Sequence, residues 1–342
     1  MKKIKEILFF IPVVIFFASC EVEFTPNAEW KNIPVVYCLL DQDEDTTWVR
    51  VQRCYLVDDN IYNYGQNTDS INYPQGSITV SLLAYENGVL KDSMDFHYVE
   101  RSRDSGNFAS ASQPLYWFET RNRLKENYTY VLTVRNATDG SILATTDPIS
   151  LICQRKENGK YIPLILKPEV HVFNGDTNYD ISGLKFNKYV GHEAYCEIQW
   201  NTMENARLYQ PMVRLYYAVN GSTQHIDLFC PKIVSKTTVN YARSQFLADV
   251  KSKLEGDTTS KQYLARVDLY LTCCTEELNV YMSNTTNSAV DSRAQGAFNN
   301  IHGGVGVFAA RRIHLYKRMP ADNSMVEDRG LLYFLKELGV GF

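Results

Sequence analysis

A glycine-rich segment near the end of the chain has the composition of an anion-binding loop. Gly303-Gly304-Val305-Gly306 offers backbone N–H groups to an anion, because glycine has no Cβ to block the approach. A phosphate loop also needs a helix directly behind it, with Lys-Ser or Lys-Thr in the P-loop form. Val307 and Phe308 continue as an apolar strand instead. We therefore predict a bulge or a close approach of two backbone segments here, and a structural hydrogen bond for His302.

No other pattern in the chain is typical of an enzyme or a metal site. The six histidines include no pair at i and i+4 with a glutamate between, and no serine stands in a G-x-S-x-G elbow. Residues 41–45 are acidic but lack the EF-hand pattern, so we expect a solvated hairpin turn there. Any two carboxylates could meet as a glycosidase pair, yet no spacing selects two. We predict a non-catalytic protein with no catalytic residue, metal or cofactor.

The eight cysteines give no metal or disulfide framework. No two of them are spaced as C-x-x-C, and the adjacent Cys273 and Cys274 would face opposite ways on a strand. We predict that most are small buried apolar residues. If Cys20 carries a lipid, seven remain, so at least one thiol stays unpaired or bonds to another chain.

Tyrosine is abundant, with 23 residues. Most of them alternate within predicted strands, where cross-strand packing explains them. Tyr62, Tyr64 and Tyr73 fall instead in residues 58–75, a segment rich in Asn, Asp and Gly that predicts a long surface loop. Exposed aromatic side chains stack on sugars or anchor protein partners. These three tyrosines are therefore candidate residues for contact with a partner.

The first twenty residues have the layout of a secretory signal peptide. Three lysines precede an apolar run at residues 7–17 that is too short to span a bilayer. Phe17-Ala18-Ser19-Cys20 then resembles a bacterial lipobox, in which Cys20 is acylated and becomes the mature N-terminus. Ordinary cleavage near Ala18 is the alternative. We predict a lipoprotein signal peptide at residues 1–19 and a lipidated tether at residues 20–34.

The mature chain would be tethered to a membrane rather than threaded through it, since no second apolar run approaches 18 residues. Glu21-Val22-Glu23-Phe24 behind the anchor resembles the signal that sends Bacteroidota lipoproteins to the outer-membrane surface. Loss of residues 1–19 changes the net charge from −4 to −6, because three lysines and one glutamate are removed. An acidic chain without basic clusters argues against nucleic acid as a partner. We expect an outer-membrane protein that is surface-exposed, with the periplasmic face as the alternative.

Alternating apolar residues predict a first domain at residues 35–151. Residues 35–40 form a compact apolar run, and the strands at residues 78–84 and 128–134 each keep one apolar face. Leu124 followed by Tyr128 is similar to the corner tyrosine of immunoglobulin-like sandwiches. We predict a mostly β protein that begins with an immunoglobulin-like β-sandwich.

A second β-rich domain with two or three short helices is predicted at residues 152–342. Asn220-Gly221 between alternating apolar strands is the strongest hairpin signal in the chain. Apolar residues at helical spacing predict a helix near residues 240–254. Ser324-x-x-Glu327 is a capping-box pattern before a last helix near residues 324–338.

Three separated motifs resemble a family of Bacteroidota lipoproteins that is defined by a domain of unknown function. The first is the run Asn32-Ile33-Pro34-Val35-Val36-Tyr37-Cys38-Leu39-Leu40, where the family usually has glycine in place of Cys38. The second is the Asn-Ala-x-x-Tyr-Gln step at residues 205–210. The third and most specific is Asn300-Ile301-His302-Gly303-Gly304-Val305-Gly306-Val307-Phe308. Together the three motifs span most of the mature chain.

The resemblance implies a mostly β envelope lipoprotein, of a kind often encoded beside TonB-dependent outer-membrane receptors. It brings no reaction or ligand, and only the anchor Cys20 is carried over to this chain. We therefore expect a non-catalytic lipoprotein that is a binding or accessory subunit of a TonB-dependent receptor or another envelope assembly. A surface glycan-binding module and an adhesin-like structural subunit are the alternatives.

Overall fold

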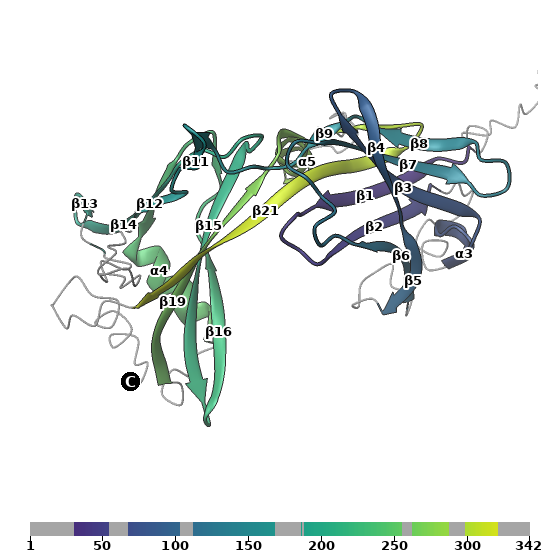
Figure 1. Ribbon diagram of the computed structural model, residues 1–342. Coiled ribbons are helices and arrows are strands. Elements are labelled where there is room, and N and C mark those ends of the chain that lie inside the picture. Colours follow the sequence, from purple (N-terminus) through teal and green to yellow (C-terminus); the bar gives the residue numbers. More distant parts are fainter. Residues whose placement is uncertain are drawn as a thin grey trace, which may run out of the picture.

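The computed structural model describes residues 31–54, 68–102, 112–167, 186, 188–254, 262–286 and 298–320. It is mostly β, as the sequence predicts, with two β-rich units side by side and one long strand running through both (Figure 1). No helix in the described ranges has the length and apolar character needed to cross a bilayer. The predicted signal peptide, Cys20, Tyr62, Tyr64 and the helix predicted near residues 324–338 lie outside the described residues.

One sheet of the N-terminal unit has the strand order β1-β2-β6-β5. Burial alternates along β1, so that Val36, Cys38 and Leu40 face the core while Tyr37 and Leu39 face outward. The acidic turn after Leu40 leads directly into β2, which pairs antiparallel with β1. The four strands are β1 (Pro34–Leu40), β2 (Thr46–Arg53), β5 (His97–Ser102) and β6 (Ser112–Glu119).

The second sheet of this unit has the order β20-β8-β7-β3-β4, with β9 beside β7. Its buried side chains, among them Leu82 and Leu132, belong to the same hydrophobic core as Val36 and Cys38. The short helix α3 (Thr68–Ile71) lies beside β2. The strands are β3 (Ile78–Glu86), β4 (Val89–Asp95), β7 (Thr129–Asn136), β8 (Ile142–Thr146), β9 (Ile149–Ser150) and β20 (Ile301–His302).

A buried tyrosine fixes the corner before β7, but it is not the predicted Tyr128. The hydroxyl of Tyr130 donates to the carbonyl of Lys125 at 3.1 Å, and Tyr130 is fully buried. Tyr128 is half-buried, and its ring lies 5.1 Å from the ammonium of Lys125. The two residues lie on the same face of the alternating strand, which is why the pattern alone did not separate them.

The described residues of the C-terminal unit hold one end of a nine-stranded sheet that continues through β1 into the N-terminal unit, a four-stranded sheet, a two-stranded sheet and two helices (Figure 1). α4 (Arg243–Lys253) packs on the sheets through Phe246 and Val250, and it starts later than predicted because β18 continues to Ala242. α5 (Glu276–Thr286) follows β19 directly. The strands are β10 (Lys156–Glu157), β11 (Lys160–Tyr161), β12 (Ile165–Lys167), β13 (Lys188–Val190), β14 (Glu193–Trp200), β15 (Leu208–Val219), β16 (Ser222–Phe229), β17 (Ile233–Val234), β18 (Thr238–Ala242) and β19 (Gln262–Cys274).

The last strand, β21 (Val305–Pro320), belongs to both units. Its first part pairs in parallel with β1, from Val305 to Ala310, and its second part pairs antiparallel with β19. The predicted domain at residues 152–342 placed this segment wholly in the second domain. In the structure, β20 and the start of β21 pair with strands of the N-terminal unit.

The glycines at the start of β21 and just before it allow two backbones to meet, as predicted. A Cβ on Gly306, whose φ is +132°, would overlap the carbonyl oxygen of Val36 on β1. A Cβ on Gly304 would lie 2.6 Å from the carbonyl oxygen of Pro34. His302 accepts or donates one hydrogen bond with Asp147 at 2.7 Å, which is the structural contact expected for it. The segment is therefore a close approach of backbones and not a phosphate loop.

The described cysteines behave as apolar residues, as predicted. All seven are free thiols, and every one except Cys54 is buried. Burial raises the pKa of Cys153 to about 11 and that of Cys274 to about 12. These thiols are therefore protonated at neutral pH and serve the core as small side chains.

Candidate binding site

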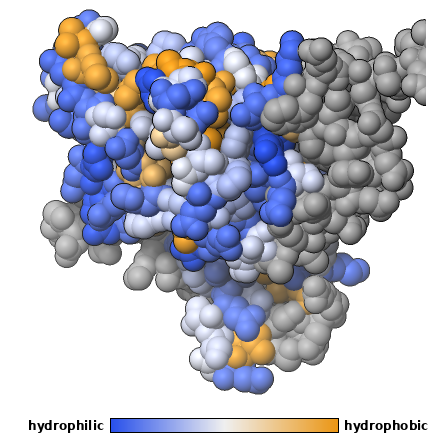
Figure 2. Space-filling view, turned by 90° about the vertical axis from the view of Figure 1, so that its right-hand side faces the viewer, coloured by the Kyte–Doolittle hydropathy of each residue, from blue (hydrophilic) through white to orange (hydrophobic). Residues whose placement is uncertain are grey.

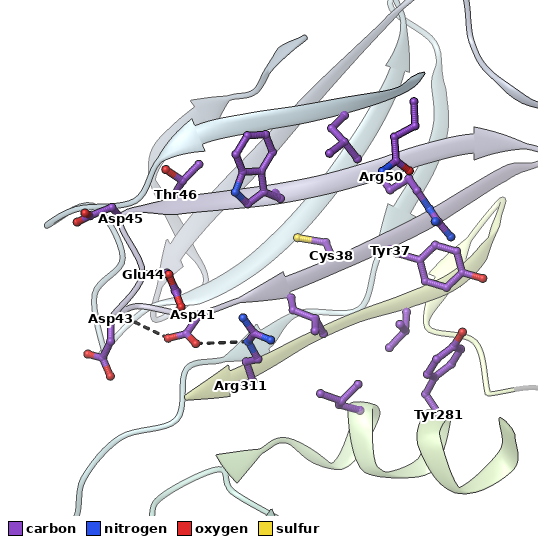
Figure 3. Close-up of a pocket in the computed structure, with 16 residues that line it drawn as sticks. Tyr37, Cys38, Asp41, Asp43, Glu44, Asp45, Thr46, Arg50, Tyr281 and Arg311 are labelled. Carbon is purple, nitrogen blue, oxygen red and sulfur yellow. Dashed lines mark hydrogen bonds and ion pairs between the residues drawn. The ribbon is translucent and has the colours of Figure 1, made fainter. Parts of the chain in front are cut away.

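The described residues enclose a pocket of about 820 Å³ over the outer face of β1 and β2, next to α5 (Figure 3). The alternation of the two strands aims their outward side chains into it, and α5 forms the opposite wall. Its lining residues are Tyr37, Cys38, Leu39, Asp41, Asp43, Glu44, Asp45, Thr46, Trp48, Arg50, Gln113, Leu115, Leu278, Tyr281, Val307 and Arg311.

Aromatic rings continue from the pocket across the sheet. Trp48 on β2 stands opposite Trp117 on β6, with ring centroids 6.4 Å apart. His97 on β5 stands opposite Trp117 on the other side, at 5.6 Å. Trp48 keeps 36% of its surface exposed. A row of rings at the outer face of a sheet is an accessible apolar platform rather than part of the core.

Tyr37, Tyr281 and Arg50 line the walls, and Arg101 lies against the Trp48 ring from outside the lining. The rings of Tyr37 and Tyr281 meet edge to face at 6.1 Å. Burial, followed by a hydrogen bond with Tyr37, raises the pKa of Tyr281 to about 12, so its hydroxyl stays protonated. The guanidinium of Arg50 lies 4.8 Å from the centre of the Tyr37 ring, and that of Arg101 lies 5.1 Å from Trp48. Each ring therefore already has a cation on one face.

The acidic turn between β1 and β2 forms one end of the pocket, and arginines balance it. Asp45 pairs with Arg121 at 2.6 Å, and Asp43 pairs with Arg312 at 2.7 Å. The turn was expected to be solvated, which holds for Asp43, Glu44 and Asp45. It does not hold for the first carboxylate of the turn, which closes β1 and points inward.

That carboxylate, Asp41, is only 4% exposed. Burial raises its pKa to about 6, although the Asp43 N–H and the nearby Arg311 favour the charged form. Its Oδ2 lies 3.4 Å from Nε of Arg311 (Figure 3). The two atoms are not aligned as a hydrogen bond. Both of them, and Nε of Arg50, are buried without a hydrogen-bond partner among the described residues.

The pocket lining presents the rings of Tyr37, Trp48 and Tyr281 beside the carboxylates of the acidic turn. Oδ2 of Asp41 and Nε of Arg50 and Arg311 have almost no accessible surface, so these three atoms do not face the pocket space. Cys38 lies in the lining with its thiol buried, and burial raises its pKa, so it is no nucleophile. Within the described part of the chain, no three His, Cys, Asp or Glu side chains cluster as metal ligands do.

Of the residues predicted for partner contact, the structure describes Tyr73, and it is not an exposed loop aromatic. Its side chain is 5% exposed, and its hydroxyl donates to Oδ1 of Asn32 at 2.6 Å. Burial raises its pKa to about 12. Tyr73 borders a smaller pocket of about 350 Å³ with Tyr98 and Arg53. Its hydrogen bond to Asn32 holds the segment just before β1, so Tyr73 has a structural role.

The residues that build the main pocket were not selected from the sequence. Tyr37 was among the tyrosines attributed to strand packing, and Trp48 and Tyr281 were not singled out. One signal could have pointed to them. Residues 35–40 are apolar on both faces of the strand, which is typical of a strand covered on both sides. What covers the outer face could not be read locally.

Comparison with known proteins does not assign this chain to a family. No family model and no curated protein matches the sequence. Among solved structures, a chain titled "Cytokine receptor complex - Crystal form 1A" aligns with 83% of this chain and 93% of its own length, at 9% identity and a TM-score of 0.20. A score this low carries no argument about fold or function.

Proposed function

We propose that this chain is a non-catalytic binding protein of the bacterial outer membrane, anchored by a lipid on Cys20 and accessory to a TonB-dependent receptor or a related envelope assembly. The observation that carries the binding role is the pocket over β1 and β2. Its volume of about 820 Å³ falls in the range of ligand sites, which are roughly 300–1,000 Å³. The surface location of the anchored protein is part of the proposal.

Two features favour binding over plain packing. Trp48 is a large aromatic residue that stays partly exposed on a sheet face, where burial would stabilise the fold more. Asp41 is a buried carboxylate in the lining whose Oδ2 pairs with Nε of Arg311 at 3.4 Å without forming a hydrogen bond, an arrangement that costs stability. Sites that give up stability in this way are typical of function.

On the remaining surface of the N-terminal unit the exposed apolar residues are scattered, which favours the pocket as the binding site. Seen from the side of that unit, apolar residues lie in separate patches among hydrophilic ones (Figure 2). The large exposed apolar side chains of this unit include Val89 and Leu90 on β4 and Ile142 on β8. Scattered apolar residues of this kind are normal on soluble surfaces.

The anchor is compatible with an outward-facing pocket. Residues 20–33 precede β1, and a fully extended chain of that length reaches about 50 Å. A tether of this reach lets the N-terminal unit stand away from the bilayer while it stays near a receptor. The acidic residues behind Cys20 support export to the surface.

The test is affinity purification of the tagged, lipidated full-length protein from native outer membranes. We expect a large β-barrel receptor to co-purify, and we expect the Cys20→Ala variant to lose most of it because that variant is not held at the membrane. A soluble loading control and an equal amount of bait keep the two preparations comparable. Recovery of the lipoprotein alone from wild-type membranes would overturn the accessory role.

A further inference from the structure

Four side chains form an apolar row across the sheet of the C-terminal unit. The row crosses β16, β15, β19 and β21, and each member stands directly opposite the next in the strand pairing. Its members, in that order, are Phe229, Met212, Tyr270 and Leu315. Phe229 is 55% exposed and Leu315 is 47% exposed, so both ends of the apolar row are open. Single exposed apolar residues are normal, whereas a contiguous set of them marks a surface that another element covers.

The described helices leave this apolar row uncovered at its ends. Successive residues of a strand face opposite ways, so Val213 and Leu269 lie on the other face of the same strands. That other face belongs to the hydrophobic core, together with Phe246 and Val250 of α4. α5 packs on β21 and lines the pocket beside Arg311. The sheet therefore buries one face and leaves an apolar row on its second face.

The chain itself supplies an apolar segment of matching length. Residues 321–342 follow β21 directly and lie outside the described residues. The sequence predicts a helix near residues 324–338, with Leu331, Leu332, Leu335 and Leu338 on one face. Residues 331–338 of such a helix would be about 12 Å long. The apolar row crosses three strand spacings, about 14 Å, so the two apolar surfaces have similar lengths.

The tether between the two surfaces is long enough. Leu315 precedes the end of β21 at Pro320 by five residues, which is about 17 Å along a strand. The eleven residues from Pro320 to Leu331 reach up to about 36 Å when extended, so the chain can turn back over the apolar row. A short tether also gives the segment a high effective concentration, which a second copy of the chain or a partner protein does not have.

We propose that the C-terminal segment docks on the apolar row, with the leucine face of residues 331–338 against Met212 and Tyr270 and its ends over Phe229 and Leu315. Docking removes both apolar surfaces from water, and it gives the sheet a second covering layer. The proposal goes beyond the proposed function and does not depend on it, because neither the pocket nor Cys20 takes part.

Photocross-linking of the full-length protein tests the docking. The photoreactive amino acid p-benzoylphenylalanine replaces Phe229 in one sample and Leu315 in another, and mass spectrometry identifies the linked peptide. We expect both positions to link to residues 331–338 of the same chain. A mixture of isotope-labelled and unlabelled protein separates links within a chain from links between copies. The same probe at Tyr161, an exposed residue of β11 outside the apolar row, is the control and should not reach residues 331–338.

Two lysine substitutions separate docking from mere proximity. Leu335→Lys places a charge on the leucine face, and we expect the yield of the cross-link to fall about tenfold because that charge cannot be buried against an apolar row. Glu337→Lys is the matched control, since residue 337 lies on the opposite side of the predicted helix and its substitution should leave the yield unchanged. Equal yields from the two variants would overturn the proposal.

The remaining outcomes are also decisive. Links between copies would make the apolar row an interface between two molecules, and links to any other segment, or none at all, would likewise refute docking of residues 331–338. Hydrogen exchange of the wild type is a second measurement that needs no variant. We expect the amides of residues 331–338 to exchange more slowly than those of an unstructured peptide, and exchange at the unstructured rate would count against docking. Receptor co-purification tests the proposed function separately from all of these results.

Discussion

The guanidinium of Arg312 lies 2.7 Å from the carboxylate of Asp43, although 269 positions separate them in the chain. Arg312 is on β21 beyond the part that pairs with β1, and Asp43 is in the β1–β2 turn. The same guanidinium donates to the carbonyl of Ile152 at 3.1 Å and lies 3.4 Å from Glu126. Its side chain is 15% exposed. One residue of the shared strand thus fixes the acidic turn, the loop before β7 and the connection between the units.

Replacement of Arg312 should destabilise the protein. We expect Arg312→Met to lower the free energy of unfolding by about 1–3 kcal/mol, because the Ile152 carbonyl and Asp43 lose a partly buried charged partner. Urea unfolding followed by circular dichroism measures the loss. Arg121→Met is the control, since the Arg121–Asp45 pair is mostly exposed and its loss should change the free energy of unfolding far less than the loss of Arg312. Equal losses in both variants would contradict the role of Arg312.

Gly306 should tolerate no side chain. Gly306→Ala places a Cβ against the Val36 carbonyl and forces an unfavourable φ, so we expect β21 to separate from β1 and stability to fall by about 3 kcal/mol or more. The midpoint of thermal unfolding and the soluble yield both report it. Gly221→Asn is the control, because Gly221 at the β15–β16 turn has φ +79° with nothing near its Cβ position. Asparagine accepts that conformation, so a small change is expected there and a similar change at Gly306 would refute the steric explanation.

Asp41 should make stability depend on pH in a defined window. Its folded pKa of about 6 exceeds the ordinary value of 3.8, so the folded state binds more protons than the unfolded state between about pH 4 and pH 6. Ionisation of Asp41 therefore lowers the free energy of unfolding as the pH rises through that window, and the full loss is reached above about pH 6. Asp41→Asn removes it, so the variant should gain about 1–2 kcal/mol over wild type at pH 7.5 and little at pH 4. Thermal melts at several pH values test this, and parallel pH profiles of the two proteins would contradict it.

Thiol reactivity should single out one cysteine of the described residues. Cys54 is partly exposed, whereas the other six are buried and protonated. In a Cys20→Ala background, we expect one thiol to react quickly with a disulfide reagent at pH 8 and the rest only after denaturation. Cys54→Ser should abolish the fast phase. A fast phase that survives this change would show that another cysteine is exposed in the native protein.

The local sequence pattern was enough to predict the types of the elements and the structural roles of several residues. The apolar run at residues 35–40 and the alternation along residues 78–84 predict strands that the structure contains, and Asn220-Gly221 marks the turn between β15 and β16. The lack of a helix behind Gly306 predicted a close backbone approach, and the Val36 carbonyl confirms it. These outcomes depend on side-chain period and backbone freedom, which neighbouring residues determine.

Pairing between distant strands had to come from the tertiary structure. β21 fills the edge of β1 and then the edge of β19, and no local preference states which edges a strand will join. The predicted division of the chain at residue 152 therefore took no account of a late strand that pairs with β1. The pocket has the same origin, since it gathers the start of the chain (Tyr37, Trp48), a helix after β19 (Tyr281) and the last strand (Arg311). The sequence alone determined which residues would lie on each face of a strand. The tertiary structure decided which strands and faces would meet, because the backbone N–H and C=O groups at a strand edge pair with whichever strand the fold places beside them, however distant in sequence.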